Sequence, residues 1–270
     1  ETIAEGYGCL KMVKATDKVR VTGKFLTFSN RNQDDLLTNG IMYVGGDFVQ
    51  KYEYKSYDEH YGNSTNFNAT ENYRVVFNGT TKQKIYFSTP YSSGFANVTF
   101  NNPNIELESG IRGFTLNEDI NLTINTEEFG VYGNALDLNH HLIGNELKVT
   151  KDNFTYTTGE MNLSGNTLNI AKDMLQNGGK INLDGGTINV GRNMEQHIGE
   201  IDLNGGKITV KRNLLQSHIM YINSGELDVG EDYYIAGTRE IESDGTENIT
   251  SSYGGCLKMV KEADIVRVGG

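Results

Sequence analysis

The sequence predicts an all-β chain wound as a parallel β-solenoid (β-helix), with roughly 20 residues per coil and about 12 coils in one long repeat. Three observations predict this fold. Segments that begin at Gly159, Gly179 and Gly199 align with one another at a constant spacing of 20 residues. Within each segment apolar and polar residues alternate, as in a strand with one buried face. Glycines separate these short runs at the points where the chain must turn.

Stacking the segments places similar apolar residues above one another, and these columns form the predicted core. Two of the predicted columns are Leu163, Leu183, Leu203 and Ile222, and Leu168, Ile188, Ile208 and Leu227. A bundle of amphipathic helices is the alternative fold. The 32 glycines and the period-two alternation exclude it.

A second, longer repeat is visible near the two ends of the sequence. Residues 8–23 and 255–270 are identical at 12 of 16 positions, at a constant spacing of 247 residues. This match predicts one complete tandem repeat, residues 8–254, between the end of a preceding repeat (residues 1–7) and the start of the next (residues 255–270). With 12 coils spaced by about 4.8 Å, one repeat would form about 60 Å of rod.

The repeat divides into a less regular and a more regular part. Residues 8–143 contain short strand-like runs at uneven spacing, such as Val19–Val21 and Met42–Val44. Residues 144–240 contain the regular 20-residue coils. The stretch 51–70 is polar and rich in tyrosine, and we interpret it as a loop that leaves the coil.

The composition indicates which classes of binding partner are not expected. The net charge is −11 with a pI near 5.0, and Lys and Arg are not clustered, which speaks against nucleic-acid binding. No apolar run approaches the roughly 20 residues of a membrane-spanning helix, so no membrane insertion is expected in this segment. The expected partner is the protein itself, as the next repeat in the same chain or as neighbouring chains in a filament.

Four blocks of sequence resemble a known group of proteins. The glycine-rich coil Asn182–Gly191, the segment Cys9–Met12 and the blocks Tyr73–Gly79 and Gln83–Ser88 look like the long tandem-repeat β-solenoid surface proteins of clostridia-like bacteria. The resemblance covers nearly the whole chain. It implies an extracellular array on the cell or spore surface, and it brings no catalytic residues to transfer.

No catalytic, cofactor or metal site is predicted. A carbohydrate-active β-helix needs carboxylates clustered with Arg or Lys, and Asp184, Asp202, Asp228 and Asp232 with Arg192 and Arg212 are the candidates. However, Asp202 shares its column with Asn162 and Asn182, which indicates an outward hydrogen-bonded ladder. Scattered calcium sites between coils are an alternative, although the short calcium-binding glycine–aspartate repeat is absent.

Two kinds of residue are candidates for contacts between chains. These are Cys9 and Cys256, and the tyrosines Tyr52, Tyr54, Tyr57 and Tyr61. One cysteine per repeat is either a small buried apolar residue, which we favour, or a cross-link between neighbouring chains. A bond from Cys9 to Cys256 within one chain is excluded, because a disulfide needs Cα atoms within about 7 Å. The tyrosines would stack on sugar rings or on a neighbouring rod, or would pack back against their own coils.

These observations together predict a structural role. The chain would be a rigid rod, and a subunit of an extracellular bacterial fibre, stalk or appendage. The alternative is a cell-surface adhesin, whose rod presents repeated glycan- or protein-binding loops. A carbohydrate-active enzyme is a third hypothesis.

Overall fold

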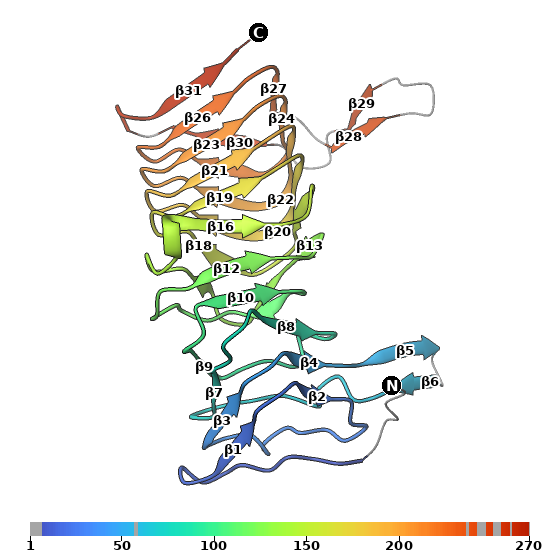
Figure 1. Cartoon of the computed structure of the whole chain (residues 1–270). Coiled ribbons are helices and arrows are strands. Elements are labelled where there is room, and N and C mark those ends of the chain that lie inside the picture. Colours follow the sequence, from blue (N-terminus) through green and yellow to red (C-terminus); the bar gives the residue numbers. More distant parts are fainter. Residues whose placement is uncertain are drawn as a thin grey trace.

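The computed structural model describes residues 7–56, 59–235, 238–241, 247–250, 255–259 and 261–269. The chain is all-β and forms a parallel β-solenoid of about 10 turns with roughly 20 residues per turn, which confirms the predicted fold. Figure 1 shows the coils rising in one stack from the N-terminal to the C-terminal end. Within the described ranges the helical content is one short 3-10 turn, η1 (Ile143–Asn145).

One eleven-stranded parallel sheet, here called the long sheet, runs the length of the stack with one strand from each coil. Its strands are, in order, β2 (Phe25–Thr27), β4 (Phe48–Gln50), β8 (Gln83–Phe87), β10 (Asn104–Leu107), β12 (Asn121–Ile124), β16 (Glu146–Val149), β19 (Thr167–Ile170), β21 (Thr187–Val190), β23 (Lys207–Val210), β26 (Glu226–Val229) and β31 (Ile265–Val268).

The other faces of the coil are formed by different sheets at the two ends. The N-terminal coils contribute a four-stranded parallel sheet of β1 (Lys18–Val21), β3 (Ile41–Val44), β7 (Arg74–Phe77) and β9 (Asn97–Phe100). The C-terminal coils contribute a ten-stranded sheet of β13 (Glu128–Phe129), β15 (Leu136–Asp137), β17 (Phe154–Tyr156), β18 (Glu160–Asn162), β20 (Met174–Asn182), β22 (Met194–Asp202), β24 (Leu214–Gln216), β25 (Ile219–Tyr221), β27 (Tyr233–Ile235) and β30 (Cys256–Lys258). Between them β11 (Ile111–Arg112) pairs with β14 (Val131–Tyr132).

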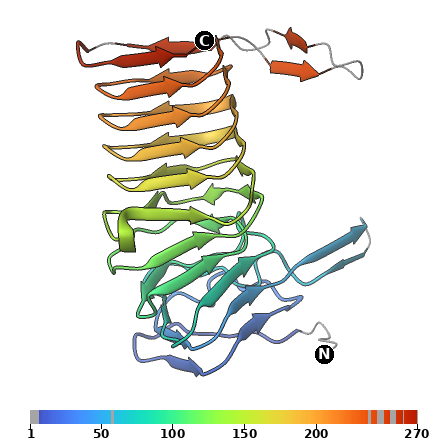
Figure 2. The ribbon, with the colours of Figure 1, turned by 45° about the horizontal axis from the view of Figure 1, so that its top comes forward.

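Two antiparallel hairpins interrupt the stack, and we call them the arms. The first arm pairs β5 (Glu53–Ser56) with β6 (Glu59–Tyr61), and the second pairs β28 (Thr238–Ile241) with β29 (Glu247–Thr250). In Figures 1 and 2 both arms project from the same side of the stack. The sequence predicted the first as a loop over residues 51–70, and it did not predict the second.

The arms explain why the prediction of 12 coils was too high. In the long sheet Phe48 is the register partner of Ile85, and Val229 is the register partner of Val268. Both intervals are nearly twice the usual length of a coil, because each of these coils contains one arm. About ten turns therefore use the residues that were assigned to 12. At about 4.8 Å per coil, ten coils form about 48 Å of rod instead of 60 Å.

Two predicted boundaries also shift. Phe67 and Ala69 are buried in the core, so the excursion is shorter than residues 51–70. The regular coils end with β27, because β28 already belongs to the second arm. We therefore call residues 144–235 the regular region and residues 8–143 the irregular region.

Each coil of the regular region begins with the same turn. Asp184 and Gly185 have φ angles of +45° and +77°, and Asn204 and Gly205 have +38° and +79°. Two successive residues at positive φ are a conformation that Asp-Gly and Asn-Gly sequences adopt readily. The turn leads into a four-residue strand of the long sheet with alternating burial, as in β21 and β23.

Both predicted core columns are confirmed. Their eight members, from Leu163 to Leu227, are fully buried. In the long sheet Leu168, Ile188, Ile208 and Leu227 are direct register partners, so each side chain packs on its counterpart in the next coil. The core of the irregular region combines aliphatic residues with a cluster of aromatic rings. There the ring of Phe48 lies 5.1 Å from that of Phe25 and 4.8 Å from that of Phe67, measured between centroids.

Candidate functional site

The two cysteines lie on the outer surface, so the buried thiol that the sequence favoured is wrong. Cys9 and Cys256 are both free and exposed. Strand β30 shows the reason: Leu257 packs against the core, and its neighbours on a strand must point the other way. Cys256 is the register partner of Ile219 on this outward face. Their exposure is compatible with the predicted contact between chains, which stays a prediction.

The predicted tyrosine cluster is only partly visible. Tyr52 is half-buried at the base of the first arm. The side chains of Tyr54 and Tyr61 and the whole of Tyr57 lie outside the described residues. Their role in contacts with sugars or with another rod therefore stays a prediction.

The surface is hollowed within the irregular region, between residues 69 and 137. A cavity of about 510 Å³ is lined by side chains that include Arg74, Asn97 and Asp137. A second cavity of about 520 Å³ adjoins it, and the two share Ala96 and Asn134. We call the pair the polar groove. No signal in the sequence pointed to it, because its residues come from coils whose spacing is uneven.

An aromatic pair stands at the second cavity. Tyr91 is 62% exposed and meets Tyr132 edge-on, with 6.1 Å between ring centroids. Beside them Arg112 donates hydrogen bonds from Nη1 to Asn68 Oδ1 at 3.0 Å and to the Ala69 carbonyl at 3.3 Å. An exposed aromatic ring beside amide and charged side chains can stack on a sugar ring and hydrogen-bond its hydroxyls.

The carboxylates considered for catalysis do not form one site. Asp202 ends β22, Asp228 lies in the long sheet, and Asp184 lies in a turn. Asp202 is the register partner of Asn182, as the sequence predicted, and Asn182 Nδ2 donates to Asn162 Oδ1 at 2.7 Å. Asp228 is paired with Lys207 at 2.5 Å. These groups form ladders and ion pairs that link successive coils.

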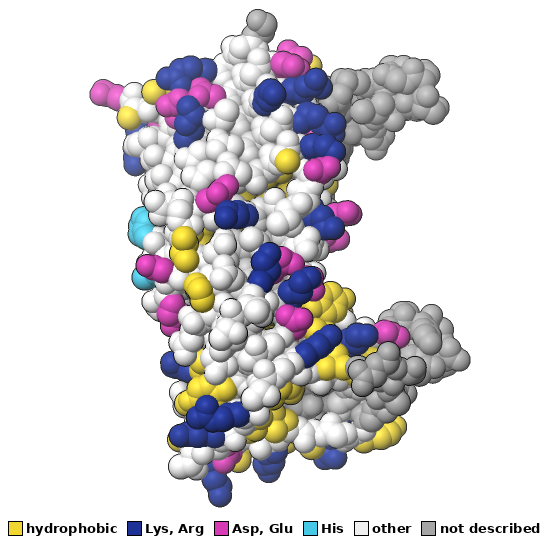
Figure 3. Space-filling view, viewed as in Figure 1, with side chains coloured by type: hydrophobic (Ala, Val, Ile, Leu, Met, Phe, Trp, Pro, Cys, Tyr) yellow, Lys and Arg dark blue, Asp and Glu magenta, His cyan; other side chains and the backbone are white. Residues whose placement is uncertain are grey.

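The two candidate arginines and Asp232 also lie at the surface. Arg192 pairs with Asp173 in the preceding coil, and Arg212 lies 3.8 Å from Glu231 in the following one. Asp232 accepts a hydrogen bond from the Tyr234 hydroxyl at 3.0 Å. Figure 3 shows basic and acidic side chains interspersed over the visible face instead of gathered in one patch.

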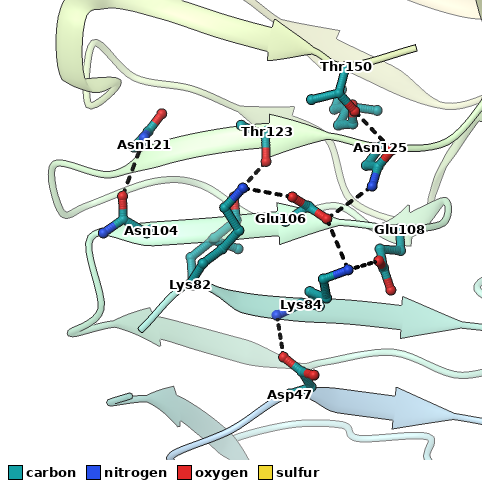
Figure 4. Close-up of polar contacts among 12 residues, drawn as sticks. Asp47, Lys82, Lys84, Asn104, Glu106, Glu108, Asn121, Thr123, Asn125 and Thr150 are labelled. Atoms are coloured by element: carbon teal, nitrogen blue, oxygen red, sulfur yellow. Dashed lines mark hydrogen bonds and ion pairs between the residues drawn. The ribbon is translucent and has the colours of Figure 1, made fainter. Parts of the chain in front are cut away.

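Among the described residues, the most enclosed carboxylate is one that the sequence did not single out. Glu106 in β10 is only 5% exposed, and Figure 4 shows it between side chains of the two neighbouring coils. Lys82 Nζ lies 2.9 Å from Glu106 Oε2, and Lys84 Nζ lies 3.4 Å from Oε1. From the other side Asn125 Nδ2 donates to Oε1 at 3.0 Å.

This environment suits a structural carboxylate better than a proton donor. Burial by itself would raise the pKa of Glu106, but the hydrogen bonds from Lys82 and Asn125 and the charge of Lys84 hold that pKa below its usual value. A general acid at neutral pH needs a raised pKa instead. The cluster therefore ties three coils of the long sheet together.

A buried glutamine ladder was not predicted from the sequence either. Gln176, Gln196 and Gln216 are fully buried at one corner of the regular coils. Gln196 Nε2 donates to the Gly199 carbonyl of its own coil at 3.1 Å and to the Ile219 carbonyl of the next coil at 3.0 Å. The sequence does contain a signal for this ladder, because Gln recurs at the same place in three successive coils. It follows Met-Leu, Met-Glu and Leu-Leu in turn.

Comparison with models of protein families, with curated protein sequences and with solved structures gives no match. Across the described ranges no group of three or more His, Cys, Asp or Glu side chains is placed to hold a metal ion. Nor does any helix in the described part of the chain have the length and apolar character needed to cross a membrane.

Proposed function

We propose that this protein is a structural rod, in which 247-residue β-solenoid repeats follow one another in an extracellular bacterial fibre, stalk or appendage. One observation carries the proposal. Residues 255–259 and 261–269, which repeat the sequence of residues 8–12 and 14–22, add a further coil directly onto the stack. In this coil β30 pairs with β25 and β31 pairs with β26, both parallel and in register.

A rod built in this way is stiff because its interactions continue across the junction. The backbone hydrogen bonds of parallel strands run along the stack, and the apolar columns form one dry core. Leu257 and Val266 of the added coil pack against that core. Consecutive repeats then need no linker, and the length of the rod increases with the number of repeats.

Chains with one, two and three tandem copies of residues 8–254 test this role. We expect the maximum dimension from small-angle X-ray scattering to increase by about 48 Å per added copy. Electron microscopy should show straight particles without a bend at each junction. Bent or compact particles would contradict a rod. Immunogold labelling of source cells with an antibody against this chain should mark surface filaments, and labelling confined to the cell interior would contradict the extracellular role.

The second candidate function is an adhesin that presents binding elements along the rod. The polar groove favours it, because Tyr91 stands exposed beside the amide of Asn134 and the guanidinium of Arg112. On a tandem array one such groove would recur in each repeat, and binding of a long glycan would gain from multivalency.

A glycan array distinguishes the adhesin from the plain rod. Binding that is lost in Tyr91→Ala supports the groove, and binding lost in a Tyr52/Tyr54/Tyr57 triple alanine variant supports the first arm. Tyr7→Ala is the matched control, because Tyr7 is 78% exposed and does not line the groove. An absence of binding by the unmodified chain would remove the adhesin.

A further inference from the structure

The repeated segment occurs twice in the chain, and its two copies lie in different sheets. Val19–Val21 belongs to β1, which pairs with β3 in the four-stranded sheet. Val266–Val268 belongs to β31, which pairs with β26 in the long sheet. In the first copy it is the next strand, β2, that lies in the long sheet. The second copy is therefore displaced around the coil by one corner.

The turn that leads into the repeated strand is the same in the two copies. Asp17 Oδ2 accepts a hydrogen bond from the backbone N–H of Lys14 at 2.9 Å, and Asp264 Oδ2 accepts one from Lys261 at 3.0 Å. Val19 and Val266 both pack against the core. The displacement thus does not come from a different conformation of this turn.

The register of the long sheet gives the size of the displacement. Ten successive pairings connect Phe25, the first residue of β2, to Val268, the last residue of β31. In the sequence repeat, however, the counterpart of Val268 is Val21. The strand ladder thus repeats four residues earlier than the sequence does. This four-residue step, from Val21 to Phe25, spans the corner between β1 and β2.

The displaced coil makes the contacts of an internal coil. Gln216 Nε2 donates to the His218 carbonyl at 2.8 Å and to the Cys256 carbonyl of the added coil at 2.9 Å, as Gln196 does one coil earlier. On the outer face Arg267 pairs with Asp228 at 2.9 Å and also with Glu226. A buried amide and an ion pair therefore both select this register.

We propose that successive repeats are related by a screw operation: each repeat rises by about ten coils and turns by one corner around the rod axis. Four residues in a coil of roughly 20 correspond to about a fifth of a revolution. This inference rests on the proposed tandem array and adds its geometry. Both arms leave the stack on the same side (Figures 1 and 2), so the rotation would distribute the arms of successive repeats around the rod. Contacts made by the arms would then be offered on all sides, which suits a bundle of rods better than a flat ribbon.

Disulfide trapping in the present chain tests the register. In a background with Cys9→Ser and Cys256→Ser, the pair Asp228→Cys and Arg267→Cys should form an intramolecular disulfide under mild oxidation, because these residues are register partners. If the repeats superposed without rotation, residue 267 would lie beside Tyr221 instead, since β25 precedes β26 by one corner as β1 precedes β2.

Two control pairs make both outcomes decisive. Thr209→Cys with Asp228→Cys joins partners inside the repeat and should be trapped in every case. Tyr221→Cys with Arg267→Cys should stay reduced. Trapping of the Tyr221 pair, or failure of the Asp228–Arg267 pair while the Thr209 pair forms, would overturn the screw.

The three-copy chain gives an independent readout by electron microscopy. Arms that wind around a straight rod support the screw, and arms in a single row overturn it while leaving the structural role intact. If the particles are not straight rods, the proposed function fails, whereas the trapped Asp228–Arg267 register would still hold.

Discussion

The regular and irregular regions differ in how much chain separates one strand of the long sheet from the next. In the regular region the interval is nearly constant, as from Leu147 to Leu168 and from Ile208 to Leu227. In the irregular region the interval from Phe48 to Ile85 is more than twice the interval from Ile105 to Leu122. Nevertheless the ladder continues without a break through both regions. The strand pairing of the long sheet is thus the same in both regions, whereas the number of residues per coil varies. Coils can vary in length because a longer loop costs little additional conformational entropy.

The cores of the two regions reflect the same difference. The core of the regular region repeats one aliphatic packing arrangement, in which each Leu or Ile packs on its counterpart in the next coil. The irregular region combines aliphatic residues with aromatic rings at many mutual angles, as in the edge-on contact of Phe48 with Phe95 and the stacked contact of Phe77 with Phe100. Large flat rings fill an uneven space that a column of identical aliphatic residues would leave partly empty.

The largest expected effect compares these two cores. Phe48→Ala removes a fully buried ring that contacts five other phenylalanines, and we expect it to lower the free energy of unfolding by about 3–5 kcal/mol. Ile188→Ala in the regular core should cost about 2–4 kcal/mol. Urea denaturation measures both losses, and hydrogen exchange should show protection lost from β2 to β8 only for Phe48→Ala. A smaller loss for Phe48→Ala than for Ile188→Ala would contradict an interlocked aromatic core.

The second test compares two glycines of the regular region, one that packs against the irregular region and one that does not. Gly159 and Gly185 have φ angles of +85° and +77°. A Cβ at Gly159 would lie 1.5 Å from the Val131 carbonyl oxygen, whereas at Gly185 nothing lies within 4 Å. We expect Gly185→Ala to cost about 1–2 kcal/mol from the positive φ alone, and Gly159→Ala about 2–5 kcal/mol because the two coils must also separate. Equal midpoints in thermal denaturation would contradict the close approach.

The third test concerns the glutamine ladder, whose described members lie in the regular region. Gln196→Met keeps the volume of the side chain but leaves the carbonyls of Gly199 and Ile219 without this donor. We expect a loss of about 1–3 kcal/mol in urea denaturation. Lys211→Met, at an exposed corner, is the control and should change stability by no more than about 0.5 kcal/mol. Equal stabilities of the two variants would mean that the ladder does not hold the coils together.

The smallest effect concerns the ion-pair cluster of the irregular region and depends on pH. The folded-state pKa of Glu106 is lowered, so its stabilisation is present above the unfolded pKa, near pH 4, and is lost as the pH falls through the folded value. Glu106→Gln should therefore cost about 1–2 kcal/mol at pH 7, and the difference from the unmodified chain should shrink below about pH 4. A difference that stays constant from pH 7 to pH 3 would show that the carboxylate charge contributes nothing.

Local repetition allowed the regular region to be predicted in detail. Each coil there has the same turn and the same alternation, so every column member from Leu163 to Leu227 could be named and is buried. The outward position of Cys256 was also available, since its neighbour Leu257 had to face the core. The general tendency of cysteine to be buried predicts the opposite, and for Cys256 this prediction is wrong.

The amino-acid sequence by itself determined the solenoid, its coil period and its apolar columns, because these depend on contacts between neighbouring coils that repeat the same pattern. Tertiary structure decided which strand stacks on which after each insertion, and hence the number of coils, the place of the second arm and the one-corner displacement of the repeated segment. The physical reason is that strand pairing joins residues as distant in the chain as Val229 and Val268, and no local pattern records how much chain the intervening loop contains.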